Sequence, residues 1–262
     1  MMRSMYAAVS GLRNHQIRMD VIGNNIANVN TVGFKSSRVT FQDTFYQMIR
    51  SGSAPDTGTG STGGGLGGTT PRQVGIGMAI NTIDTYFTQG AVLPTGNFTD
   101  LMIQGDGLFM VSSEYIDPNG GGFTTPPASV FYTRAGVFGF DAGGNLVNKS
   151  NGMYVVGKEI SIDSTTGEKN YAQTFTIINI GDPATVNTVA INSQGEIVVD
   201  GVPKWVVGLA KFPTPEGLTK KGENLFAQDP SAGTPKLGKV GDTGFGNTSI
   251  VPGALEMSNV DL

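Results

Sequence analysis

The side chains that most often carry catalysis or bind metals are scarce in this sequence. Its 262 residues include one histidine, His15, and no cysteine. Disulfides, thiolate catalysis and cysteine-ligated metals are therefore excluded, and one chain cannot supply a two-histidine metal site. Any catalytic or binding motif must rest on glycines, hydroxyls and carboxylates.

A glycine pattern at residues 58–63 has the spacing of a nucleotide-binding loop. Gly58, Gly60 and Gly63 match G-x-G-x-x-G, but this motif binds phosphate only between a strand and a helix. The sequence predicts neither element on its flanks. No lysine follows a glycine run as in a P-loop, and no serine lies in a G-x-S-x-G turn. We expect no nucleotide site and no hydrolase nucleophile.

The carboxylates and the single histidine have simple structural explanations. Asp100, Asp106 and Asp141 lie close to turn glycines, where aspartate side chains accept hydrogen bonds from the backbone. His15 has no obvious acid or nucleophile beside it, and a packing or surface role fits it better than catalysis. Trp205 is expected in the core, as is Phe212. We therefore expect a protein that is not an enzyme and needs no cofactor or metal.

Composition narrows the classes of partner. The net charge is −4 and lysines and arginines form no cluster, so we expect neither nucleic-acid nor anionic-lipid binding. No apolar run reaches the ~20 residues of a membrane-spanning helix, and no membrane insertion is expected. Charged residues are only 15% of the chain, which suggests surfaces that neighbouring subunits cover.

The N-terminal region carries an apolar stripe with coiled-coil spacing. Met5, Leu12, Met19 and Ile26 recur every seven residues, and Val9 precedes Leu12 by three. This pattern predicts an amphipathic helix that ends near residues 28–30. The candidate assembly residues are Met5, Val9, Leu12, Met19, Ile22 and Ile26.

Two surfaces could cover this stripe: the chain's own β domain, or helices of other copies. Residues 51–70 are nearly all Gly, Ser and Thr and are expected to form a flexible linker. A helix on such a linker is free to dock elsewhere, and an isolated helix of this length is marginal in water. We favour pairing between copies.

The rest of the chain is expected to be β structure. Short apolar runs separated by Asp-Gly, Asn-Gly and Pro-containing turns continue from about residue 74 to 255. Residues 39–49 fit either helix or strand. The predicted fold class is mainly β: an antiparallel domain of hairpins, preceded by a coiled-coil-type helix and a glycine-rich linker.

Several segments together resemble flagellar hook and rod proteins. The opening residues 2–12 and the segment DVIGNNIANVNTVGFK at 20–35 are the most recognisable. Later blocks are GNFTDLMIQGDGLF at 96–109, YTRAGVF at 132–138, GENLF at 222–226 and PGALEMSNVDL at 252–262. The matches span nearly the whole chain.

The resemblance implies four segments. They are an inner helical assembly segment (1–34), a connector with the linker (35–72), an outer β domain (73–255) and the start of a C-terminal helical segment (256–262). In the family that last segment leads into a long helix, which would be the natural partner of the N-terminal stripe. The sequence stops at Leu262, and we expect it to be a truncated form.

The implied function is a self-assembling subunit of the extracellular part of the flagellum. The ending of the chain favours the hook, with the distal rod as the alternative. An adhesin-like or carbohydrate-binding β module and a secreted hydrolase are the competing classes, and filament formation would discriminate against both. Implied partners are copies of itself, adjacent rod, hook or hook-junction proteins, the hook cap and the flagellar type III export apparatus.

A short phenylalanine motif is a candidate signal for that export apparatus. Phe41 and Phe45 are the first and last residues of the segment FQDTF, which looks like the motif that such subunits offer to the export gate. The alternative is that both rings simply pack against the β domain. Both interpretations stand on the sequence alone.

Overall fold

The computed structural model describes residues 2–54, 67–117, 121–162, 168–183, 185–186 and 188–261. The chain forms two compact units, which are described separately below. The helix–hairpin unit comprises Met1–Asn25 and Ser37–Thr85, and the sheet unit comprises Ile26–Ser36 and Tyr86–Leu262. The short connector 26–36 therefore belongs with the sheet unit.

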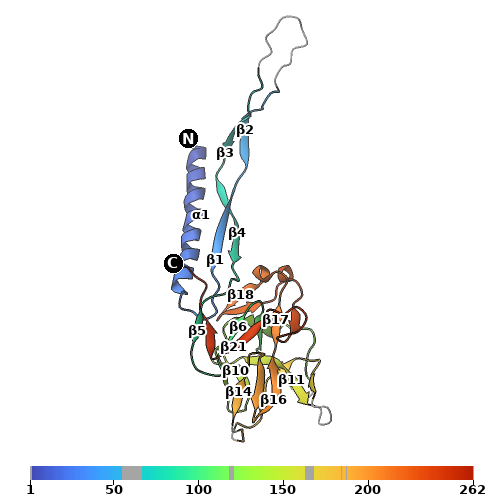
Figure 1. The fold of residues 1–262 in the computed structure, drawn as a ribbon. Coiled ribbons are helices and arrows are strands. Elements are labelled where there is room, and N and C mark those ends of the chain that lie inside the picture. Colours follow the sequence, from blue (N-terminus) through green and yellow to red (C-terminus); the bar gives the residue numbers. More distant parts are fainter. Residues whose placement is uncertain are drawn as a thin grey trace, which may run out of the picture. The chain divides into compact units, whose positions relative to one another are not determined.

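The helix–hairpin unit consists of one helix beside a long two-stranded ribbon (Figure 1). Helix α1 spans Met2–Ala27 and is followed by turns, so it ends where the asparagines predict. In the ribbon, β1 (Ser37–Asp43) pairs with β4 (Met78–Thr85). Beyond a break in the ladder, β2 (Tyr46–Arg50) pairs with β3 (Arg72–Gly75).

The described ends of the segment 51–70 continue this ribbon beyond β2 and β3. Ser53 and Thr69 form an antiparallel bridge, and residues 55–66 between them lie outside the described part of the chain. The ambiguous segment 39–49 is extended. Strands β1 and β2 lie within residues 35–72, where the sequence suggests a connector.

The sheet unit is built from short antiparallel strands. The longest hydrogen-bonded path runs β14-β15-β16-β11-β7-β8-β19-β18. Two further pairs, β21 with β6 and β22 with β5, bring the last strands of the sheet unit against the first strands of the same unit. The strands and 3-10 turns are β5 Val92–Pro94, β6 Leu101–Gln104, β7 Leu108–Ser112, β8 Val130–Thr133, β9 Phe138–Phe140, β10 Leu146–Asn148, β11 Tyr154–Ile162, β12 Lys169–Tyr171, β13 Thr176–Ile177, β14 Val189–Ile191, β15 Glu196–Val199, β16 Val202–Val207, β17 Leu209–Lys211, η1 Pro215–Gly217, β18 Thr219–Gly222, β19 Leu225–Ala227, η2 Pro230–Ala232, β20 Lys236–Gly238, β21 Ser249–Pro252 and β22 Ala254–Glu256.

Two apolar clusters form the core of the sheet unit. One gathers Phe109, Phe138 and Trp205 with the aliphatic residues around them. The other is centred on Tyr132 and Phe212. Trp205 and Phe212 are both buried, as predicted. The fold class is confirmed: mainly antiparallel β structure with one N-terminal helix.

Candidate assembly surface and its anchor

The predicted stripe on α1 is exposed along its whole length. Exposed fractions are 65% for Met5, 72% for Leu12, 65% for Met19 and 51% for Ile26, and Val9 and Ile22 are exposed as well. No described residue of α1 is buried. Helix α1 thus exposes an apolar surface of a kind that soluble monomers rarely expose.

A different face of α1 contacts the ribbon. This face carries small and polar side chains, and Asn14 Nδ2 donates to the carbonyl of Met78 over 2.6 Å. Asn25 Nδ2 donates to Ser37 O, and its Oδ1 accepts from Ser37 N. A Cβ on Gly77 would clash with Ser10 Oγ. Within its unit, the helix is held by polar contacts, and the apolar stripe takes no part in them.

The two phenylalanines of the candidate export motif have different surroundings. Phe41 is half-buried, and its ring meets His15 edge-on with 5.5 Å between centroids. Phe45, between β1 and β2, is 87% exposed. Packing therefore accounts for Phe41 and for the single histidine, whereas Phe45 has no comparable burial.

The connector 26–36 is anchored to the sheet unit by buried charges. Lys35 Nζ donates to Glu256 Oε1 over 2.6 Å and to Thr88 O over 2.7 Å. Arg134 Nη1 donates to the other carboxylate oxygen of Glu256 over 3.2 Å. The side chains of Lys35 and Glu256 have no exposed surface. Burial lowers the pKa of Lys35, and the charge of Glu256 opposes that shift.

Backbone contacts complete this anchor. Gly33 N donates to Glu256 O over 2.8 Å, and Gly90 N donates to Glu256 Oε1. Gly33 has a φ of +70°, and a Cβ there would lie 2.6 Å from Ala135 N. Only glycine fits this close approach without strain. The close approach of the connector to Ala135 therefore depends on Gly33.

A second set of contacts surrounds the same connector. Ser36 N donates to Asn259 Oδ1 over 2.7 Å. Lys220 Nζ donates to Lys35 O over 2.8 Å and lies 4.8 Å from the ring centroid of Phe34. The sequence analysis quoted Phe34, Lys35 and Asn259 only as parts of motifs, did not single out Ser36 or Lys220, and assigned none of them a role.

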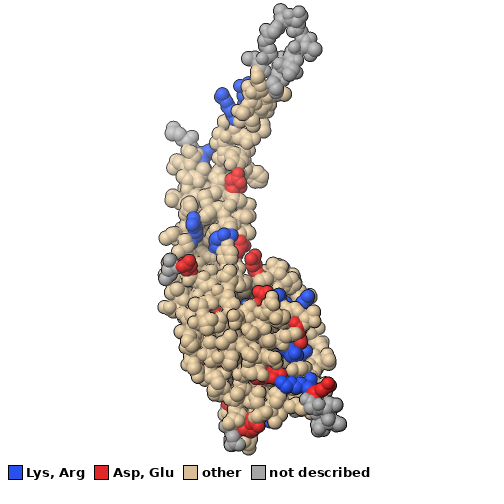
Figure 2. All heavy atoms as spheres, viewed as in Figure 1, with Lys and Arg blue, Asp and Glu red and all other residues tan. Residues whose placement is uncertain are grey.

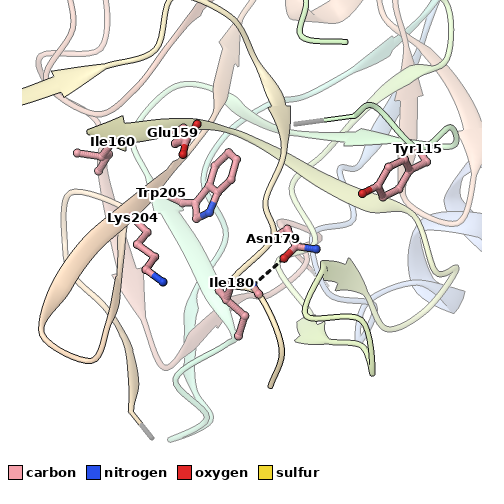
Figure 3. Close-up of a pocket in the computed structure, with 8 residues that line it drawn as sticks. Tyr115, Glu159, Ile160, Asn179, Ile180, Lys204 and Trp205 are labelled. Carbon is pink, nitrogen blue, oxygen red and sulfur yellow. Dashed lines mark hydrogen bonds between the residues drawn. The ribbon is translucent and has the colours of Figure 1, made fainter. Parts of the chain in front are cut away.

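The described part of the sheet unit contains a hollow lined by apolar, polar and charged side chains. It has a volume of about 530 Å³ and is lined by Tyr115, Glu159, Ile160, Asn179, Ile180, Gly181, Lys204 and Trp205. Figure 3 shows these side chains spread around its wall. No serine, threonine or histidine is among them. Within the described residues, no group of three histidine or carboxylate side chains is placed to hold a metal, and no helix there has the length and apolar character to cross a membrane.

Two protein-family models match separate segments of the chain. A family model described as "Flagella basal body rod protein" matches residues 5–35. A second, "Flagellar hook protein FlgE/F/G D1 domain", matches residues 102–199. The flagellar basal-body rod protein FlgG of Bacillus subtilis is 39% identical over all of this chain and 86% of its own length. The chain belongs to the family of flagellar hook and basal-body rod proteins.

The relatives of this chain include both rod proteins and hook proteins. FlgG of Agrobacterium fabrum is 31% identical over 99% of the chain and 86% of its own length. The flagellar hook protein FlgE of Treponema pallidum is 47% identical over 157 residues, which are 60% of this chain and 30% of that protein. The chain spans less than a third of such hook proteins. The resemblance drawn from the sequence is confirmed, and the family places the protein in the flagellum.

Proposed function

We propose that the protein is a structural subunit of the flagellar hook, without enzymatic activity, that assembles with copies of itself into a helical tube transmitting motor torque. The observation that carries this proposal is the exposed apolar stripe of α1, on a helix with no buried residue. Burying such a surface is worth ~25 cal/mol per Å². Contacts that repeat head to tail without closing a ring produce an open helical polymer.

The hook assignment is supported by sequence identity, and the rod is the second candidate. Identity to the Treponema pallidum hook protein is 47% over 157 residues. A different observation favours the distal rod: the whole chain is 39% identical to a rod protein, and the match covers 86% of that protein's length. Both roles use the same helical stripe, so the surface itself does not discriminate between them.

Export belongs to the same proposal. The subunit would leave the cell through the flagellar type III apparatus and be assembled outside, next to rod, hook-junction and hook-cap proteins. Phe45 is well placed for recognition because its ring is 87% exposed. Phe41 would become available only while the chain is unfolded.

Gold-labelled antibody on purified hook–basal bodies tests the function. Decoration along the curved hook is the expected result, and decoration of the rod alone would select the second candidate. A deletion strain that keeps complete rods and hooks would overturn both. Filaments formed by the purified full-length protein, seen by negative-stain microscopy, would separate either role from an adhesin or hydrolase.

A further inference from the structure

The buried cluster of Lys35, Arg134 and Glu256 holds two cations and one carboxylate. Lys35 and Glu256 have no exposed side-chain surface, and the Arg134 side chain is 5% exposed. Figure 2 shows other charged side chains scattered over the surface, where water solvates them. A charge buried without a counter-charge costs far more free energy than an exposed one. Burial lowers the pKa of Lys35, and loss of its proton removes the excess positive charge.

Lys35 also has the surroundings of a nucleophile. A lysine amine attacks a carbonyl carbon only in its neutral form, and desolvation favours that form. Glu256 Oε1 lies 2.6 Å from Lys35 Nζ, close enough to accept a proton from it as a general base. Arg134 Nη1 donates to the other oxygen of the same carboxylate over 3.2 Å and so fixes its orientation.

An amide side chain lies beside the same amine. Lys35 Nζ and Asn259 Nδ2 donate to one acceptor, the carbonyl oxygen of Thr88, over 2.7 and 3.3 Å. Ser36 N donates to Asn259 Oδ1 over 2.7 Å, so it polarises the amide carbonyl and would stabilise the negative charge of a tetrahedral intermediate. The Nδ2 group is held by Thr88 Oγ1 and by Tyr86 O, both at 2.9 Å. Amine, base and polarised amide therefore meet in one place.

We propose that Lys35 and Asn259 form an intramolecular isopeptide bond in the folded protein. The neutral Nζ of Lys35 attacks Cγ of Asn259, the Nζ–Cγ bond forms, and the Cγ–Nδ2 bond breaks. Glu256 accepts one proton from Nζ and passes it to Nδ2, which leaves as ammonia. The electron pair of Nζ makes the new bond and that of the broken bond leaves with Nδ2, so no oxidant or cofactor is required.

The bond would tie the connector 26–36 covalently to the segment that follows β22. It would also leave Arg134 as the only buried cation beside Glu256, because an amide nitrogen carries no charge. A crosslink between residues so far apart in the sequence stabilises a protein by restricting its unfolded chain. This covalent modification goes beyond the proposed structural role and does not depend on whether the subunit belongs to the hook or to the rod.

Mass spectrometry of the purified, folded full-length protein tests the bond. The intact mass is expected to be lower than the mass of the polypeptide by one molecule of ammonia. Tryptic digestion should yield a branched peptide in which residues 19–38, uncut at Lys35, are joined to the segment from residue 240 onward through Asn259. Absence of this branched peptide from the folded protein would overturn the inference, even if ammonia has been lost from another asparagine.

Two variants separate the roles of the amide and the base. N259A removes the attacked carbonyl and should have the full mass and no branched peptide. E256Q keeps the amine and the amide but lacks the base, so the branched peptide should form about a hundredfold more slowly. Should E256Q fail to fold, wild type and N259A still decide the question, because full polypeptide masses for both would overturn the inference.

A second lysine–carboxylate–asparagine cluster in the sheet unit supplies the matched control. Glu196 accepts hydrogen bonds from Lys169 over 2.7 Å and from Asn192 over 2.9 Å, but the Lys169 side chain is 40% exposed. Solvation of this lysine disfavours the reaction, so N192A should keep the branched peptide and the ammonia loss of the wild type. Loss of ammonia that disappears in N192A and persists in N259A would overturn the inference.

Discussion

Lys35 and Glu256 lie 221 positions apart in the sequence, and their charged groups are 2.6 Å apart with no exposed surface on either side chain. Arg134 contacts the second oxygen of the same carboxylate. One carboxylate thus neutralises two buried cations from different parts of the chain. The contact fixes the connector after α1 to the last strand of the sheet unit.

Replacing Glu256 with glutamine should destabilise the sheet unit strongly. The substitution leaves Lys35 and Arg134 buried without their counter-charge, and breaking such a pair costs about 3–5 kcal/mol. Denaturant unfolding of the purified protein measures the loss. The control is D106N, which removes the exposed partner of Lys211 and should cost less than about 1 kcal/mol. Equal effects of the two variants would show that the buried cluster contributes no more than a surface pair.

Aspartate in the α1 stripe should abolish assembly without unfolding the sheet unit. Leu12 is 72% exposed and Ile26 is 51% exposed, so Leu12→Asp and Ile26→Asp cost little in the monomer. In the polymer they bury an unpaired carboxylate, at several kcal/mol. Circular dichroism checks the fold, and sedimentation and swimming check assembly. Leu12→Met is the matched control and should assemble normally. Normal hooks with Leu12→Asp would contradict an assembly role for the stripe.

Glu196 should make the sheet unit sensitive to acid. Burial raises its pKa, but hydrogen bonds from Lys169, Asn192 and Tyr171 outweigh this and bring it below the ordinary value of 4.5. Because the folded-state pKa is lowered, the stabilisation is complete above the ordinary value and is lost as the pH falls through the folded-state pKa.

Unfolding midpoints measured between pH 3 and 7 test this dependence. The wild type should lose stability steeply below about pH 4.5, because protonation then favours the unfolded chain. Glu196→Gln should be less stable at pH 7 and show a shallower fall. Parallel curves for the two proteins would assign the acid sensitivity to other carboxylates.

Local patterns predicted the parts of this molecule that depend on local chemistry. The seven-residue spacing of Met5, Leu12, Met19 and Ile26 predicted an amphipathic helix, and α1 spans Met2–Ala27. Asp141 accepts hydrogen bonds from Gly143 N and Asn145 N, as turn chemistry predicted. Both features arise from residues that are close in the sequence.

Features that depend on distant residues were not predictable in the same way. The partners of Lys35 are set by strand pairings near the two ends of the chain, which no local spacing encodes. The β1–β4 ribbon was predicted only in part. Residues from about 74 onward, which include β4, were expected to be β structure, whereas residues 39–49 were left open between helix and strand. Arg50 of β2 and Arg72 of β3 are register partners across the ribbon, and this pairing depends on a register shift between Met48 and Arg50. The sequence does not reveal that shift.

Replacing the two phenylalanines of the export motif one at a time should have different effects on the folded protein. Phe41 packs against His15, so Phe41→Ala should destabilise the helix–hairpin unit by removing a ring contact. Phe45 is 87% exposed, so Phe45→Ala should leave the folded protein unchanged. A loss of secretion with Phe45→Ala can therefore not be attributed to lost packing.

Secretion is measured as subunit in the medium against subunit in the cytoplasm, in a strain unable to polymerise hooks and at matched expression. If the export gate binds Phe45, the Phe45→Ala variant should accumulate in the cytoplasm, and the double variant should do so at least as strongly. Tyr46→Ala, at the neighbouring exposed position, is the control and should be secreted normally. Undiminished secretion of the Phe41→Ala/Phe45→Ala double variant would show that the export gate needs neither phenylalanine. Packing would then remain as the role of Phe41.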